Sequence, residues 1–258
     1  MNILYLDLFA GISGDMTLGA FIDLGVKEEV LLDGFKKLNL EEEYEVTIEK
    51  VIKNGISGTK VNIILEEHHH HHHDDHDHEE DNHHHHEHRN LFDIEKVIDE
   101  SSLSENVKDL SKRIFKHVAL AESKVHNEPL DKIHFHEVGA TDSILDIVGT
   151  AICINELEID RIISSPVHTG TGFVNCQHGI IPVPVPATME ILKTCKIPTY
   201  SKGIKNELVT PTGAAIVAEL VDEFMYLDNV EIEKIGYGAG DRDLEIPNMV
   251  RMVLGKKK

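Results

Sequence analysis

Histidine and acidic side chains dominate one short stretch of this chain. Thirteen of its 19 histidines lie within 68–88, and 66–88 also holds nine Asp or Glu and no Lys or Arg. Neutral imidazole is a ligand that suits nickel, copper and zinc, and carboxylates add oxygen donors. The stretch therefore predicts a segment that collects transition-metal ions. The predicted ligands are His68, His69, His70, His71, His72, His73, His76, His78, His83, His84, His85, His86 and His88.

The composition of this stretch also predicts its structure. Residues 67–90 have almost nothing apolar to bury, so we expect a disordered loop that wraps several ions without a fixed geometry. Two plainer explanations stay open. The six consecutive histidines over 68–73 look like a purification tag, although a tag normally sits at a terminus. A solvated acidic linker is the other, although a linker has no need of thirteen imidazoles. Composition does not choose between nickel, copper and zinc.

A second group of metal-binding residue types follows in the sequence HFHE and the acids after it. On an extended segment His134 and His136 point to the same face, because side chains alternate. Glu137, Asp142 and Asp146 place three carboxylates close by in the sequence. This spacing predicts a fixed metal site with the two histidines as ligands. His136, Glu137 and Asp142 are also candidate catalytic groups, since neutral histidine and carboxylates exchange protons near neutral pH.

A glycine-rich turn follows the first predicted strand. A turn that opens a helix presents bare backbone N–H groups and the positive end of the helix dipole, which together bind anions. Gly11, Ser13 and Gly14 are the predicted phosphate contacts, and Asp7 and Asp15 are candidate ligands for a divalent cation beside the phosphate. Such turns also use glycine for steric reasons alone, and that explanation stays open. No GxxxxGK[ST] motif is present, which disfavours a P-loop nucleotidase.

Two segments of the second half offer further sites. Thr210, Thr212 and Gly213 open a predicted helix and form another candidate phosphate site. In the segment HTGTGFVNCQH over 168–178, Cys176 and His178 are spaced like two residues on the same face of a strand. Sulfur beside imidazole suits nickel or copper. A buried Cys176 that only fills space is the alternative.

Charge and composition exclude several classes of function. The formal charge is −21, and 66–88 supply −9 of it. Such an acidic protein repels nucleic-acid phosphates, so we expect no nucleic-acid partner. No run approaches 18 apolar residues, and MNILYLDLF lacks the basic start of a signal peptide, so we expect no membrane association. Cys153, Cys176 and Cys195 form no CxxC pair, which fits a reducing cytoplasm.

Strands alternate with helices along the chain, which predicts an α/β fold, with α+β as the alternative. We expect mixed sheets with flanking helices, an N-terminal α/β lobe over 1–66, the His-rich loop over 67–90 and a main α/β body over 91–258. Strands are predicted at 3–8, 44–53, 59–65, 160–167, 171–174, 226–237 and 247–254. Helices are predicted at 16–26, 27–38, 91–100, 104–126, 141–157, 187–195 and 210–222, with 181–187 as an extended, proline-rich loop.

Six segments in matching order resemble the nickel insertion protein family of nickel-pincer cofactor biosynthesis. They are YLDLFAGISGDMTLGAFIDLGV, the His-rich insertion, HFHEVGATDSILDIVG, SSPVHTGTGFVNCQHGIIPVPVPAT, GIKNELVTPTGAA and EKIGYGAGDRDLEIPN. The resemblance runs nearly end to end. It implies a nickel-inserting, lyase-type enzyme that acts on pyridinium-3,5-bisthiocarboxylic acid mononucleotide, whose two thiocarboxylate sulfurs and one ring carbon bind the metal. The alternative is a non-catalytic nickel metallochaperone or storage protein.

The resemblance has further implications for cofactors and partners. In that family the reaction requires cytidine triphosphate (CTP) and Mg²⁺ or Mn²⁺. Members continue for about 150 further residues, the scale of a domain, and this chain stops at Lys258. We therefore expect the C-terminal nucleotide-binding domain to be absent and to be supplied by a separate polypeptide. A nickel-pincer-dependent apoenzyme of the lactate racemase type is the expected recipient of the cofactor, and a homo-oligomer is the expected assembly.

The implied reaction also assigns roles to the candidate residues. A metal–carbon bond on a pyridinium ring requires the loss of a ring proton, so the site needs a base, for which His136 or Glu137 is suited. An anionic mononucleotide needs the helix N-termini at 11–14 or 212–213, because the net charge of the protein repels it.

Overall fold

The computed structural model describes residues 1–40, 43–65, 89–133, 135, 141–176 and 178–257. The strands are β1 (Asn2–Asp7), β2 (Tyr44–Lys53), β3 (Ile56–Leu65), β4 (Arg161–Ser164), β5 (Val167–His168), β6 (Phe173–Cys176), β7 (Gly179–Pro182), β8 (Thr199–Tyr200), β9 (Glu223–Phe224), β10 (Val230–Ala239) and β11 (Met249–Lys257). The helices are α1 (Gly14–Leu24), α2 (Glu28–Lys36), α3 (Leu91–Glu100), α4 (Glu105–His126), the 3₁₀ turn η1 (Leu130–Lys132), α5 (Thr141–Glu156), α6 (Pro186–Thr194) and α7 (Pro211–Leu220).

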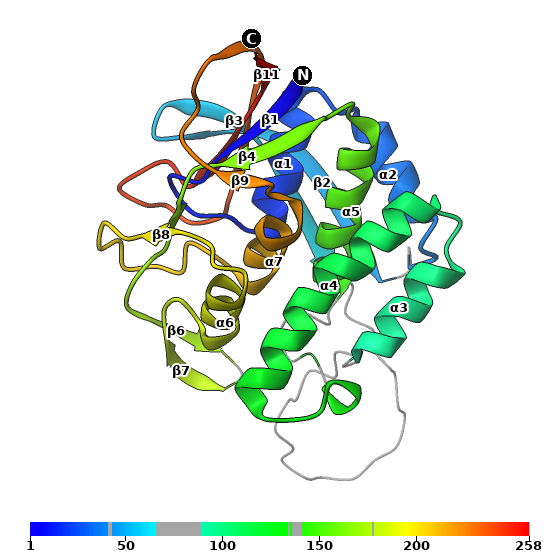
Figure 1. Ribbon diagram of the computed structural model, residues 1–258. Helices are drawn as coiled ribbons and strands as arrows, with labels where there is room; N and C mark the ends of the chain where they lie inside the picture. The colour runs from blue at the N-terminus through cyan, green and yellow to red at the C-terminus, as the bar shows by residue number, and fades with distance from the viewer. Residues whose placement is uncertain (41–42, 66–88, 134, 136–140, 177, 258) are drawn as a thin grey trace, which may run out of the picture.

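The predicted α/β class with mixed sheets and flanking helices is confirmed. Seven strands form one sheet in the order β2-β3-β10-β11-β1-β4-β9, with both parallel and antiparallel pairs. Helices lie against this sheet and extend beyond it (Figure 1). The regions 1–66 and 91–258 both contribute strands, and the division into a lobe and a body at these bounds stays a prediction. Within the described residues no helix is long and apolar enough to cross a membrane.

Strand β1 positions the first candidate site because it is buried on both faces. Leu4 and Leu6 point into the main core, which also contains the apolar side of α1. Ile3 and Tyr5 alternate with them and pack in a smaller cluster on the opposite face. A strand apolar on both sides is typical of a sheet interior. The turn that follows β1 is therefore held by a rigid strand at its start.

Two predicted boundaries are wrong. The strand expected over 160–167 is divided into β4 and β5, which belong to different sheets and are separated by Pro166, a residue that donates no backbone hydrogen bond. The segment expected to be an extended loop from residue 181 begins inside β7, which pairs with β6 in an antiparallel hairpin. Proline is tolerated there because Pro182 is the last residue of an edge strand.

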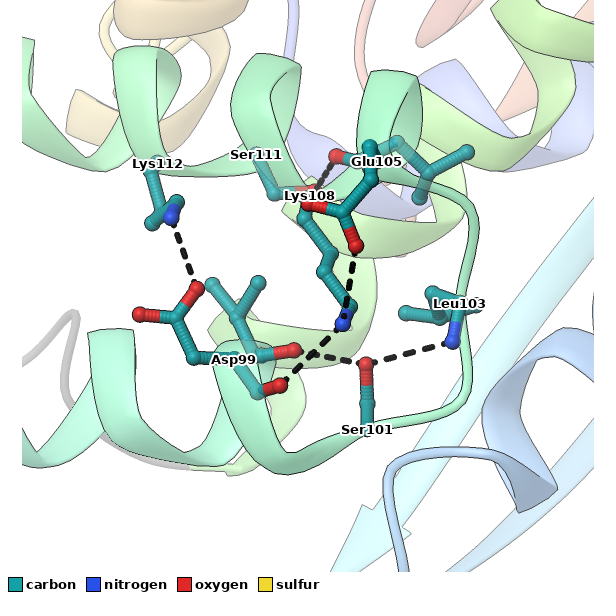
Figure 2. Close-up of polar contacts among 9 residues, drawn as sticks. Asp99, Ser101, Leu103, Glu105, Lys108, Ser111 and Lys112 are labelled. Atoms are coloured by element: carbon teal, nitrogen blue, oxygen red, sulfur yellow. Dashed lines mark hydrogen bonds and ion pairs between the residues drawn. The ribbon is translucent and has the colours of Figure 1, made fainter.

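The helices after the His-rich region are anchored by polar contacts. The side chains of Asn90 and Asp93 form a capping box at the start of α3. Figure 2 shows the connection to α4, where the Ser101 hydroxyl donates to the last turn of α3 (2.6 Å) and accepts from the N–H of Leu103 (3.4 Å). Lys108 donates to the carbonyl of Asp99 (3.1 Å). These contacts fix the start of α3 and the connection from α3 to α4.

Candidate functional site

The two predicted phosphate-binding turns lie side by side. The N–H of Ile12, in the turn between β1 and α1, donates to the carbonyl of Leu208 (2.8 Å). The N–H of Thr210 donates in turn to the carbonyl of Ile12 (3.2 Å). The start of α1 and the start of α7 therefore flank one backbone junction. The sequence predicted each turn separately, and only the fold brings them together.

Close backbone packing explains two glycines of these turns. Gly11 has a φ of +79°, and a Cβ atom on it would lie 1.9 Å from the carbonyl oxygen of Leu208. A Cβ on Gly213 would lie 2.2 Å from the carbonyl oxygen of Ile12. The N–H groups of both glycines already donate within their own turns, at 3.1 Å each. The steric explanation therefore accounts for these two positions without a ligand.

The N-terminus of α1 is occupied by acidic side chains. Ser13 is the N-cap, but its hydroxyl donates to the carboxylate of Asp15 and makes no side-chain cap hydrogen bond. Asp146 of α5 approaches the first turn so closely that a Cβ on Gly14 would lie 2.1 Å from its Oδ2 atom. A carboxylate is favoured at a helix N-terminus by the helix dipole. A phosphate that bound here would meet these two carboxylates first.

Asp146 is the most perturbed acid of this cluster. Burial raises the pKa of Asp146 well above its ordinary value, and the nearby carboxylates of Asp15 and Asp142 raise it further. Its Oδ1 atom is buried and has no hydrogen-bond partner among the described residues. Burial also raises the pKa of Asp15. A carboxyl that keeps its proton above the ordinary range can act as a proton donor or acceptor near neutral pH.

Asp142, a predicted catalytic residue, lies one helical turn before Asp146 in α5. Its Oδ1 atom accepts a hydrogen bond from the N–H of Ser143 (2.7 Å), within the first turn of the helix. Asp142 and Asp15 therefore stand on two different helices around the same buried carboxyl. Sequence reasoning noted Asp146 only as a nearby acid. The signal that could have singled it out is its spacing of four residues from Asp142 in an otherwise apolar helix.

Two cationic side chains lie near the turns. Arg251 of β11 donates to the carboxylate of Asp7, and its Nε lies 3.0 Å from Oδ2. Lys60 of β3 pairs with Asp241, and both influence the pKa of Asp15. A cation bound by Asp7 would have to displace the guanidinium of Arg251. An anion bound here would therefore share Arg251 and Lys60 with the carboxylates that already pair with them.

Arg89, which follows the His-rich stretch, contacts one residue of the HFHE motif and the first residue of α5. Its Nη2 donates to both carboxylate oxygens of Glu43 (2.8 and 2.9 Å), and its Nη1 donates to the hydroxyl of Thr141 at the start of α5 (3.0 Å). The carbonyl of Arg89 accepts from the N–H of Phe135 (3.4 Å). Phe135, the one described residue of the HFHE motif, is 1% exposed and is therefore fixed in the core. Arg89, Phe135 and Thr141 are therefore neighbours in space.

The predicted histidine ligands and one catalytic candidate lie outside the described residues. These are His134, His136, the catalytic candidate Glu137 and the thirteen histidines of 68–88. Their assignments stay predictions. Among the residues that the structure describes, no group of three or more His, Cys, Asp or Glu is arranged to hold a metal ion.

His168 has a structural role. Its Nδ1 lies 2.6 Å from the carbonyl oxygen of Phe9, and its Nε2 accepts the N–H of Lys202 (3.1 Å). The ring stacks on Tyr200 with centroids 4.7 Å apart, and the residue is 0% exposed. Both ring nitrogens are engaged by the backbone, so His168 joins three chain segments and offers no lone pair to a metal.

Cys176 and His178 are not a same-face strand pair. Strand β6 ends at Cys176, which pairs with Gly179 across the hairpin, and His178 lies in the turn. The ring of His178 lies against that of His126 at the end of α4, with centroids 5.0 Å apart. The strand prediction failed because a tight turn with Gly179 at φ +85° follows directly.

The fold and the sequence together define an α/β protein whose chain contains a histidine-rich segment and whose described residues include a cluster of buried acids. A family model described as nickel insertion protein matches residues 4–258, and the chain belongs to this family. No solved structure is significantly similar to it.

Relatives of the chain carry the name pyridinium-3,5-bisthiocarboxylic acid mononucleotide nickel insertion protein. The relative from Clostridium kluyveri is 54% identical over 258 residues, which cover 100% of this chain and 63% of that protein. Those from Acetivibrio thermocellus and Geobacillus kaustophilus are 50% and 48% identical over the whole chain, which spans 61% and 60% of their lengths. The chain therefore spans less than two thirds of each of these relatives.

Proposed function

We propose that this chain takes up nickel and inserts it into pyridinium-3,5-bisthiocarboxylic acid mononucleotide, the substrate in the names of its relatives. One structural observation carries the proposal. Arg89, the first described residue after the His-rich stretch, donates to Thr141 through its side chain and accepts from the N–H of Phe135 through its carbonyl. These contacts support the proposal that a metal collected on the His-rich stretch passes to the HFHE motif across this connection.

Nickel is the cargo of the proposed reaction. The imidazoles of 68–88 collect it, and His134 and His136 hold it for transfer. The two histidines fill only two coordination positions of the nickel ion. The other positions stay available for the thiocarboxylate sulfurs of the substrate. Soft sulfur donors compete well for nickel, so transfer from imidazole to sulfur is favourable.

Formation of the nickel–carbon bond requires a base. The electron pair of the ring C–H bond becomes the metal–carbon bond, and the proton passes to the protein. His136 or Glu137 accepts this proton, and Asp142 supports its transfer toward solvent. Asp146, with its raised pKa, keeps a proton in the same cluster.

The mononucleotide phosphate is proposed to bind where α1 and α7 begin. Ser13, Gly14 and Thr212 lie at these helix N-termini, beside the paired turns. A neutral Asp146 removes one negative charge from this region, and Lys60 adds a positive charge nearby. Both effects lower the repulsion that the acidic protein exerts on the substrate.

CTP and Mg²⁺ or Mn²⁺ are proposed to act through the part of the relatives' length that this chain does not span. We propose that this lyase-type activity needs a C-terminal partner polypeptide and that the chain assembles as a homo-oligomer. A nickel-pincer-dependent apoenzyme is proposed to receive the product. These proposals are supported by the family resemblance of the sequence.

The test is the replacement of His134 and His136 together by Ala, assayed for nickel in the purified mononucleotide with the C-terminal polypeptide and CTP present. We expect metallation to be lost while circular dichroism is unchanged. The matched control is the double variant His126→Ala, His178→Ala, which removes two histidines elsewhere and should retain metallation. Normal metallation by the first variant would refute the proposed role of the motif.

A nickel store is the second candidate function, favoured by the thirteen imidazoles of 68–88. Deletion of 68–88 separates the two. An inserting enzyme keeps its activity when free nickel is plentiful, because the motif takes up the metal directly. A store loses its bound nickel and leaves metallation by other components unaffected.

A further inference from the structure

Three helices bring a cysteine, a histidine and a glutamate together away from the site described above. Helices α4, α6 and α7 pack on one another (Figure 1). His117 lies in α4, Cys195 is the C-cap of α6, and Glu219 lies in α7. The Sγ of Cys195 is 3.6 Å from Nδ1 of His117, and Nε2 of His117 is 3.1 Å from Oε2 of Glu219. Glu219 also binds Arg113 through Oε1 (2.5 Å).

This arrangement sets the tautomer of His117. An ionised carboxylate only accepts hydrogen bonds, so Nε2 of His117 carries the proton that it donates to Glu219. The other ring nitrogen, Nδ1, then presents its lone pair to the thiol of Cys195. A metal-binding histidine usually donates its second nitrogen to a carboxylate in this way, which orients the ring and makes it a stronger donor.

The spacing of sulfur and nitrogen matches a tetrahedral metal site. Zinc binds thiolate at about 2.3 Å and imidazole nitrogen at about 2.0–2.1 Å, so a tetrahedral angle places the two donors about 3.5–3.6 Å apart. The observed separation of Cys195 and His117 is 3.6 Å. We propose that Cys195 and His117 bind a thiophilic divalent cation such as Zn²⁺, Co²⁺ or Ni²⁺, with Glu219 orienting the histidine from behind.

The thiol of Cys195 is better suited to bind a metal ion than to act as a nucleophile. Burial raises the pKa of Cys195, and the carboxylate of Glu219 raises it further, so the free thiol stays protonated. A nucleophilic cysteine needs a thiolate before it meets its substrate, whereas a bound cation itself drives off the thiol proton. The side chain of His117 is 26% exposed, which leaves an approach for the ion.

In a tetrahedral site, the two remaining coordination positions would be filled by ligands other than Cys195 and His117. Among the described residues no third His, Cys, Asp or Glu completes a metal group here. A site with two protein ligands binds its ion weakly and releases it readily to water or to an external sulfur donor. This inference does not rest on the proposed function, since binding is measured without substrate.

Cobalt tests the site in the full chain. Bound Co²⁺ gives a thiolate-to-metal charge-transfer absorption that the imidazoles and carboxylates of 68–88 do not produce. We expect the intensity of this absorption to correspond to one bound thiolate per chain. The absorption should be lost in Cys195→Ser and kept in Cys176→Ser. Glu219→Gln should weaken Co²⁺ binding by about tenfold or more, as for other partners behind a metal ligand. Absence of the absorption, or its survival in Cys195→Ser, would overturn the proposal.

Alkylation provides a readout that needs no variant. Iodoacetamide modifies accessible thiols, and mass spectrometry of peptides resolves the three cysteines. Zn²⁺ should slow the modification of Cys195 at least several-fold and leave that of Cys176 unchanged. Equal modification of Cys195 with and without Zn²⁺ would count against the site, and buried Cys153 serves as the unreactive reference.

Discussion

The carboxylate of Asp146 packs on the backbone of Gly14, where even a Cβ atom would come within 2.1 Å of Oδ2. The contact joins the first turn of α1 to the second turn of α5. It holds one carboxyl out of water next to two others, Asp15 and Asp142, and this environment keeps the pKa of Asp146 high. A buried acid of this kind is costly to stability when it ionises.

We expect Asp146→Asn to stabilise the protein by about 1–3 kcal/mol at neutral pH, because the buried carboxyl must take up a proton on folding and the amide does not. The pKa of Asp146 is raised on folding, so the folded state binds the proton more tightly. The stability of the wild type should therefore fall, relative to Asp146→Asn, as pH rises from the ordinary value of 3.8 toward the raised pKa.

Urea unfolding of both proteins at several pH values measures this difference. Asp109→Asn, at an exposed position of α4, is the control and should change stability little. A constant difference between Asp146→Asn and the wild type across the pH range would contradict the raised pKa.

Arg89→Lys should lower the rate of cofactor metallation by about tenfold, because lysine replaces a planar two-pronged donor with a single charge. Nickel uptake by 68–88 should stay the same, since those imidazoles are intact. Nickel titration and metallation assays on the same variant separate the two effects. Arg161→Lys alters a more exposed ion pair with Glu223 and should leave both unchanged. Full metallation by Arg89→Lys would remove the structural basis of the proposed transfer path.

His168→Ala should destabilise the protein by about 1–3 kcal/mol, because it empties the space of a buried ring that stacks on Tyr200 and removes the hydrogen bonds to Phe9 and Lys202. The number of nickel ions bound should not change. Denaturant unfolding and nickel titration are the measurements, with His126→Ala at a more exposed position as the control. A loss of bound nickel in His168→Ala would show that the residue is a ligand after all.

Thr210→Val should cost about 1 kcal/mol, because it removes the N-cap of α7, where the hydroxyl accepts the N–H of Gly213 (3.1 Å). Thr210→Ser keeps this acceptor and should restore most of the stability. If the substrate phosphate binds at this turn, the valine variant should also raise KM for the mononucleotide more than it lowers kcat. An unchanged KM would place the phosphate elsewhere.

Most of the elements could be predicted because their signals are local. A continuous apolar run marks β1, 3.6-residue apolar patterns mark α4 and α5, and Thr210-Pro211 marks the start of α7. The prediction failed at Pro166 and at Gly179, where short strands change sheet or turn within one or two residues. Such changes depend on the partner strand, which a local pattern does not identify.

The composition of 66–88 and the HFHE motif by themselves predict a protein that handles a transition metal, because the affinity of imidazole for such ions is a property of the side chain itself. Only the tertiary structure decided that Asp146 meets Gly14, that Arg89 bridges to Thr141, and that Cys195 faces His117. Each of these contacts joins residues far apart in the sequence. Their distances follow from how helices and strands pack around a shared core, and a local pattern of residues carries no record of that packing.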